Sequence, residues 1–108
     1  KVLQMIEGIC KISGAGPGRI YVYGMTIAER KVDFLSIIAY VEQYDEETGR
    51  WKSVDAWRKD TYETEYLDWR KIMSIEGGKS YRIHCEHLAG DDYPYETAFS
   101  LSETFYAK

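Results

Sequence analysis

Short runs of alternating apolar and polar residues, separated by turns rich in Gly, Pro and Asp, limit the fold of this sequence more than any other feature. Successive side chains of a β-strand point to opposite faces, so this alternation predicts half-buried strands. Turn residues at such intervals are typical of antiparallel sandwiches and barrels. The runs predicted as strands are residues 7–12, 19–28, 34–44, 50–58, 80–88 and 97–106.

The run 34–44 is apolar on both faces, as expected of a central strand. The segment "DEETG" (residues 45–49) follows it directly, and Gly49 supplies the positive φ that tight turns commonly need. The sequence therefore predicts a hairpin that joins residues 34–44 to residues 50–58.

The segment 60–75 fits two structures. Asp60 and Glu63 have the spacing of a helix capping box, and large side chains recur nearby at helical intervals. Residues 66–74 also alternate as a strand does. The strands on either side favour a strand at 66–74, and a helix remains the alternative.

The segment "SIEGGKSYRIHCEH" (residues 74–87) holds two histidines, a cysteine and a glutamate. On a strand, His84 and Glu86 point to one face and Cys85 and His87 to the other. Four ligands cannot converge from such a segment, and the sequence has no second Cys/His cluster, so we expect no metal site. The Gly-Gly turn ending at Gly78, followed by Tyr81, resembles a tyrosine corner, in which the tyrosine hydroxyl bonds to upstream backbone.

These patterns together predict one domain, residues 1–108, with an all-β fold. Ten tyrosines against three phenylalanines also favour β structure. We expect an antiparallel β-sandwich of about seven strands, like the immunoglobulin and fibronectin domains.

Several classes of function do not fit the composition. The net charge is −4 and the basic residues lie in scattered pairs, so nucleic-acid binding is not expected. The longest apolar stretch, residues 37–41, is far too short for a transmembrane segment. The segment "GAGPGR" (residues 14–19) lacks the Lys-Ser/Thr ending of a phosphate loop, and we expect no cofactor.

The sequence shows no catalytic residues that we would assign. His84 and His87 are its only histidines, and no strained Gly-x-Ser-x-Gly turn is present. We therefore do not expect an enzyme. A small hydrolase that uses paired carboxylates is the enzymatic alternative.

Two tryptophans mark the candidate ligand-binding residues. On a regular strand Trp51, Asp55 and Trp57 share one face, which is too polar for a plain core. This face could stack a sugar ring or a peptide side chain. In the alternative, one tryptophan is buried and the other lies at an edge.

Four segments carry a resemblance to a known family: "EGICKIS" (7–13), "GRIYVYGMTIAERKVD" (18–33), "WKSVDAW" (51–57) and "GKSYRIHCEH" (78–87). They resemble a family of small exported proteins of Gram-positive bacteria with a domain of unknown function. The resemblance implies an extracellular or cell-envelope location, and it assigns no catalytic residue. The start at Lys1 is expected of a processed or trimmed chain.

Cys10 and Cys85 allow one disulfide or two buried thiols. Cys10 lies in the opening motif of the resembling family, whereas we expect most members to lack a cysteine at position 85. Residues of a first and a penultimate strand are not obvious neighbours in a sandwich. The sequence leaves both states open.

The expected function is an exported, non-catalytic module that binds a protein or a glycan at the cell surface. A structural alternative is an envelope protein that self-assembles into oligomers through an exposed edge strand.

Overall fold

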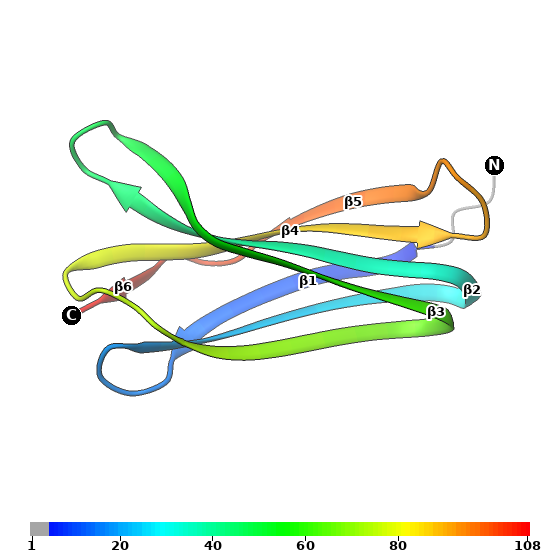
Figure 1. The fold of residues 1–108 in the computed structure, drawn as a ribbon, viewed down its shortest axis with the longest axis horizontal. Helices are drawn as coiled ribbons and strands as arrows, with labels where there is room; N and C mark the ends of the chain where they lie inside the picture. Colours follow the sequence, from blue (N-terminus) through cyan, green and yellow to red (C-terminus); the bar gives the residue numbers. More distant parts are fainter. Residues whose placement is uncertain (1–4) are drawn as a thin grey trace.

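The computed structural model describes residues 5–108, which form an antiparallel all-β fold of six strands. Among the described residues, no helix has the length and apolar character needed to span a membrane. The strands are β1 (Met5–Gly14), β2 (Arg19–Asp45), β3 (Arg50–Ser74), β4 (Lys79–Gly90), β5 (Glu96–Leu101) and β6 (Phe105–Ala107) (Figure 1).

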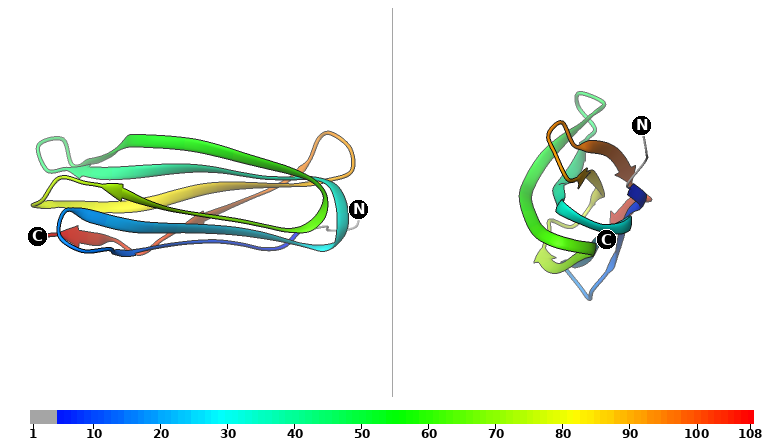
Figure 2. Two further views of the ribbon diagram at one scale, coloured as in Figure 1. Left: turned by 60° about the horizontal axis from the view of Figure 1, so that its bottom comes forward. Right: turned by 90° about the vertical axis from the view of Figure 1, so that its right-hand side faces the viewer.

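All six strands belong to one strongly curled sheet, a half-barrel seen end-on in Figure 2. The strand order is β1-β2-β4-β5, with β3 paired to β2 and β6 paired to β4. The antiparallel all-β prediction is confirmed. In place of the expected two-sheet sandwich of about seven strands, the described residues show six strands in a single sheet.

The sheet curls because its two longest strands bend. Strand β2 has 27 residues and β3 has 25, and they pair along almost their whole length. The register breaks where Ile27 pairs with Tyr66 and Val32 pairs with Thr64, which leaves four residues of β2 opposite one residue of β3. Below, the halves of β2 are residues 19–27 and 32–45, and the halves of β3 are residues 50–64 and 66–74.

The bend explains where the predicted strands differ from the observed ones. Runs 19–28 and 34–44 are parts of one strand, β2, and run 50–58 joins run 66–74 in β3. The strand prediction for 66–74 is confirmed, and the helical alternative for 60–75 is wrong. Glu63, the second residue of the supposed capping box, lies instead at the bend with a φ of 50°.

Two turns shape the ends of these strands. The predicted hairpin is confirmed, since the Gly49 N–H donates to the Asp45 carbonyl at 2.8 Å and Gly49 has a φ of 71°. The predicted strand 97–106 is divided into β5 and β6. Between them Ser102 exchanges two hydrogen bonds with Ile83 of β4, one through its side-chain hydroxyl at 2.8 Å and one through its N–H at 2.9 Å.

Two rows of inward-facing side chains cross the middle of the core. The first row consists of aligned partners on β1, β2 and β3: Cys10, Gly24 and Trp69. The second row consists of aligned partners on β3, β2, β4 and β5: Trp57, Ala39, Cys85 and Ser100.

The two rows stack on each other across the core. At one end the rings of Trp69 and Trp57 meet edge to face, with their centroids 4.7 Å apart. At the other end Ser100 donates a hydrogen bond to the Cys10 sulfur at 3.2 Å. Gly24 leaves room for the indole, because a Cβ there would lie 3.1 Å from the Trp69 ring. The rows therefore join the two halves of the curled sheet.

Gly8 of β1 is a sensitive point in this packing. A Cβ at Gly8 would lie 2.5 Å from Cγ of His87, whose fully buried ring is hydrogen-bonded through both nitrogens and cannot move aside. We predict that Gly8→Ala lowers the free energy of unfolding by about 2 kcal/mol, because the core has no room for the added methyl group. Urea unfolding of the variant beside the wild type measures this difference.

The matched control for this prediction is Gly14→Ala in the same strand. Its Cβ would meet the ring of Phe105 at 3.2 Å, and that ring is only partly buried. We expect this substitution to cost less than half as much. Equal costs at the two positions would show that the loss reflects strand propensity and not the contact with His87.

Candidate functional site

The predicted platform residues Trp51 and Trp57 point to opposite faces of the sheet. Val41 pairs with Asp55 whereas Glu42 pairs with Ser53, so β3 carries one extra residue at this point. Such a bulge reverses the alternation of side chains. The prediction assumed a regular strand, and the structure does not bring the two indoles together.

Trp51 lies on the outer face near the tip of the hairpin. Its ring is 5.3 Å from the Tyr44 ring, and the Arg82 guanidinium lies 4.2 Å from its centroid. Arg82 is also paired with Glu42 at 2.7 Å. Trp51 thus belongs to a local surface cluster that includes neither Asp55 nor Trp57.

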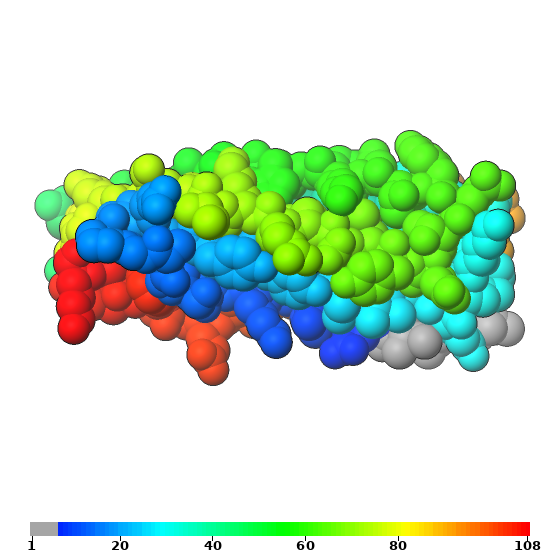
Figure 3. Space-filling view, turned by 90° about the horizontal axis from the view of Figure 1, so that it is seen from below, coloured from blue at the N-terminus to red at the C-terminus, as the bar shows by residue number. Residues whose placement is uncertain are grey.

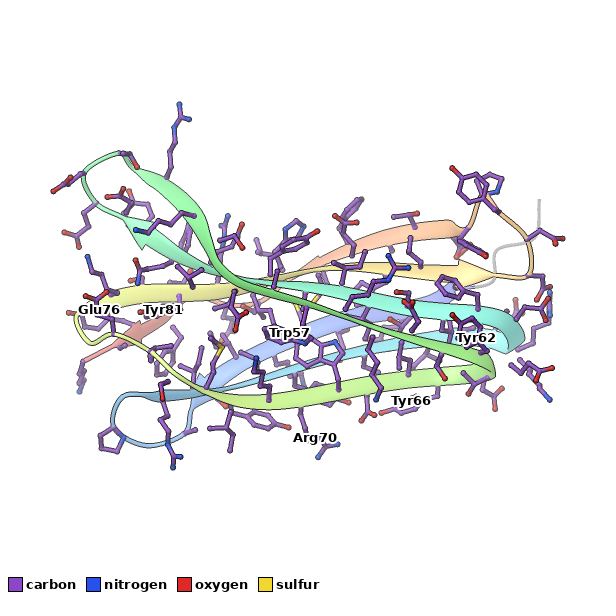
Figure 4. The ribbon with its side chains drawn as sticks, viewed as in Figure 1. Trp57, Tyr62, Tyr66, Arg70, Glu76 and Tyr81 are labelled. Carbon is purple, nitrogen blue, oxygen red and sulfur yellow. The ribbon has the colours of Figure 1, made fainter. Side chains whose placement is uncertain are left out.

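Trp57 lies where the two halves of β3 face each other (Figure 4). Asp55 lies at the same place, because it is paired with Lys71 of the other half. The Lys71 ammonium is 4.6 Å from the Trp57 ring centroid and 3.4 Å from the Asp55 carboxylate. Lys59 closes the same seam by donating to the Asp68 carbonyl at 2.8 Å. These contacts give Trp57 and Asp55 a structural role.

The outer face of the first half of β2 carries the clearest candidate surface. Its side chains alternate with fully buried ones, so half-buried aromatic and apolar groups line up on the outside. Figure 3 views the molecule from this side, where β1 and β3 flank β2. We define the tyrosine face by six residues of β2 and β3: Tyr21, Tyr23, Met25, Tyr66, Arg70 and Ile72.

A groove runs along the tyrosine face between β1 and β2. It has a volume of about 470 Å³, and β1 contributes Ile9, Lys11 and Ser13 to its lining beside Tyr21 and Tyr23. On the other side of β2, Ile72 is 56% exposed and Tyr66 is 45% exposed. A contiguous exposed surface of this kind marks a binding site more often than scattered apolar residues do.

Polar groups at the tyrosine face lie beside its rings. The hydroxyls of Tyr23 and Tyr66 are 3.4 Å apart, and the Arg70 guanidinium lies 5.8 Å from the centroid of the Tyr23 ring. The hydrogen bond with Tyr23 raises the pKa of Tyr66 to about 12. Tyr66 therefore stays neutral, and its hydroxyl can both donate to and accept from a ligand.

Tyr81 and Gly78 form the turn that the sequence predicts to resemble a tyrosine corner. The Tyr81 hydroxyl donates to the Glu76 carbonyl at 3.1 Å and accepts from the Glu76 N–H at 2.9 Å (Figure 4). It also accepts from the Gln43 side chain at 2.9 Å. Gly78 has a φ of 78° in this turn and donates to the Ala107 carbonyl at 2.7 Å. Both residues hold the β3–β4 connection in place.

A chain of buried polar groups crosses the core, and the sequence analysis did not detect it. Thr26 Oγ1 lies 2.7 Å from His87 Nδ1, and His87 Nε2 lies 2.7 Å from Ser100 Oγ. Ser100 donates to Cys10, so its oxygen accepts from Nε2–H, and Nδ1 accepts from Thr26. The four residues of this chain, Cys10, Thr26, His87 and Ser100, come from four different strands. Only the alternation of each with outward-facing neighbours could have indicated that they face inward.

The electrostatics of this chain follow from burial. Burial lowers the pKa of His87 to about 4, so the imidazole is neutral at neutral pH. The hydrogen bond from Cys85, assisted by Ser100, lowers the pKa of the Cys10 thiol. The same contact and burial raise the pKa of Cys85. Both thiols are free in this structure, and they are direct neighbours.

In the described part of the chain, the carboxyl groups whose pKa is shifted have it lowered. A general acid in glycoside hydrolysis needs a raised pKa. The pKa values of Asp91 and Asp45 are instead lowered, the first by its ion pair with Arg30 and the second by the Glu47 N–H. The Asp91 carboxylate also accepts from the Asp33 N–H at 3.0 Å, which ties the β4–β5 loop to the bend of β2.

Comparison with known proteins adds no family to this description, since no protein-family model and no curated protein matches the chain. The surface itself offers ring faces, hydroxyls and a guanidinium, which suit the binding of a polar ligand with apolar patches. The inferences about function are therefore drawn from the tyrosine face and the buried thiols.

His87 makes the stability of the fold depend on pH. Its pKa is about 4 in the folded chain and about 6.5 when unfolded, so between these values the unfolded chain binds more protons. The stability that depends on neutral His87 is therefore fully present above about pH 6.5 and is lost as the pH drops towards 4. We predict a loss of about 2–3 kcal/mol between pH 7.5 and pH 4.5, measured by urea unfolding.

The variant His87→Gln tests the assignment to this residue. Glutamine does not titrate, so the difference between pH 7.5 and pH 4.5 should shrink to well under half of the wild-type value. His84→Gln is the matched control, because His84 is the other histidine and lies half-buried on the outer face of β4, and this variant should keep the wild-type slope. An unchanged slope in His87→Gln would contradict the prediction, even though that variant is less stable at every pH.

Proposed function

We propose that this protein is an exported, non-catalytic module that binds a glycan at the cell surface through the tyrosine face. The observation that carries the proposal is the line of outward-facing Tyr21, Tyr23 and Met25 on β2, beside an open groove. The paired strand β2 fixes the positions of these side chains, and no other strand of residues 5–108 covers them.

The chemistry of the face favours a sugar over a protein partner. The C–H faces of a sugar ring pack against tyrosine rings, while Arg70, Ser13 and the tyrosine hydroxyls can bond its hydroxyl groups. The groove of about 470 Å³ is open, so a sugar bound there would rest on the tyrosine rings with its other side in solvent.

The proposed location rests on the family resemblance alone. The four segments that resemble small exported proteins of Gram-positive bacteria include "GRIYVYGMTIAERKVD" (residues 18–33), which contains Tyr21, Tyr23 and Met25. An exported module of this kind would meet glycans of the cell envelope. Peptidoglycan and envelope polysaccharides are therefore the first ligands to test.

The test is a binding screen of the folded protein against immobilised peptidoglycan and envelope polysaccharides. We predict that Tyr21→Ala and Tyr23→Ala each weaken binding by about five- to tenfold, because each removes a ring worth roughly 1–1.4 kcal/mol on which a sugar stacks. Phe99→Ala is the matched control, since Phe99 is 65% exposed on β5, outside the tyrosine face, and should bind as the wild type does.

Each other outcome overturns part of the proposal. If no glycan binds the wild type, the occupant is not a glycan. A mass that rises with concentration by light scattering, and falls in Tyr23→Ala, would instead assign the face to a second copy of this chain. Binding that is lost in Phe99→Ala and kept in Tyr23→Ala would place the site on the outer face of β4 and β5.

A further inference from the structure

Cys10 and Cys85 meet across the core although they lie on β1 and β4, which do not pair. The Cys10 thiol donates to the Ile83 carbonyl at 3.4 Å and accepts from Ser100 at 3.2 Å. Ile83 lies two residues before Cys85 on the same strand, and Ser100 is the cross-strand partner of Cys85. The Cys10 sulfur thus lies where the Cys85 side chain enters the core, close enough for each thiol to shift the pKa of the other.

The two thiols differ in their access to solvent. Cys85 is fully buried, whereas Cys10 is 8% exposed. Cys10 also borders a hollow of about 390 Å³ whose lining includes Lys11, Leu101 and Glu103. A small reagent that enters this hollow meets Cys10 first and reaches Cys85 only through it.

We infer that Cys10 and Cys85 form a thiol–disulfide pair, in which Cys10 reacts with a low-molecular-weight disulfide and Cys85 resolves the product. The inference goes beyond glycan binding and does not depend on it.

The reaction balances as two exchanges. The Cys10 thiolate attacks one sulfur of the small disulfide, forms a mixed disulfide and releases one small thiolate. Cys85 then loses its proton and attacks the Cys10 sulfur, which releases the second small thiolate and forms the Cys10–Cys85 bond. The two cysteines are oxidised, the small disulfide is reduced to two thiols, and the two protons from the cysteines pass to those thiols.

The surroundings of Cys10 suit the attacking role. A thiolate at this position accepts the Ser100 hydroxyl hydrogen bond and that of the Cys85 thiol, which is why the pKa of Cys10 is lowered. Cys85 has its pKa raised by the same contact and by burial, so it stays protonated until the mixed disulfide forms.

The bond would join two parts of the sheet that backbone hydrogen bonds do not connect. In the described residues β1 pairs with β2, and it lies against β4 and β5 through side chains. A covalent link from Cys10 to Cys85 closes this side of the curled sheet and restricts the unfolded chain, so it raises thermal stability.

The experiment treats the reduced, folded wild type with oxidised glutathione and follows intact mass, free thiols and the melting temperature. We expect the loss of two hydrogens, no retained glutathione, no free thiol and a melting temperature higher by about 10 °C. Cys85→Ala should stop at one retained glutathione on Cys10. Cys10→Ala should leave Cys85 unmodified in the folded protein.

Two results would overturn the inference. In the first, both thiols of the folded wild type stay free while the urea-unfolded chain reacts. In the second, the folded wild type keeps glutathione on Cys10 and forms no internal bond. If a variant does not fold, an acid quench of the wild-type reaction followed by peptide mapping still decides which cysteine carries the first adduct, and an early adduct on Cys85 also contradicts it.

Discussion

The contact between Trp57 and Trp69 is the interaction on which the shape of this protein depends. Both residues lie on β3, and in a straight strand their separation would be about 40 Å. Their ring centroids are 4.7 Å apart, so β3 must fold back over itself. Gly24 favours this approach, because a Cβ there would lie 3.1 Å from the Trp69 indole, which is tighter than an ordinary contact. The bend is therefore linked to one specific aromatic pair and one glycine.

The bend also decides which side chains are left outside. A single layer that curls on itself encloses one face and leaves the other in solvent. Inward positions of β2 such as Ile20 and Val22 are fully buried. In residues 5–108, no second sheet covers the apolar outward positions between and beyond them. The tyrosine face is thus a consequence of the half-barrel, because a second packed sheet would have used these residues as core.

Local patterns in the sequence predict the strands and turns well, since alternation and turn glycines are local properties. They did not predict that β2 continues through the charged residues Glu29, Arg30 and Lys31, which lie between two of the predicted strands and form the exposed side of the bend. Val41 and Glu42 are neighbours on β2, but their partners on β3 are two residues apart, which reveals a bulge that the pattern of one strand does not show. This bulge places Trp51 and Trp57 on opposite faces.

The candidate sites were harder to predict, because they depend on the curl of the sheet. Tyr81 was found from a short local motif, since its hydroxyl bonds to backbone five residues away in the chain. Cys10 and Ser100 meet only after β1 approaches β5 across the core. No spacing along the chain indicates such a meeting, which is why the sequence left the state of the two cysteines open.

Strand β1 connects the two functional features of the molecule. Neighbouring side chains of a strand point to opposite faces, so Cys10 points into the core while Ile9 and Lys11 line the groove of the tyrosine face. Whatever holds Cys10 against β4 and β5 also holds the backbone that carries this groove wall. The packing of Cys10 in the core therefore helps to position the strand whose outer side lines the groove, together with the backbone pairing of β1 and β2.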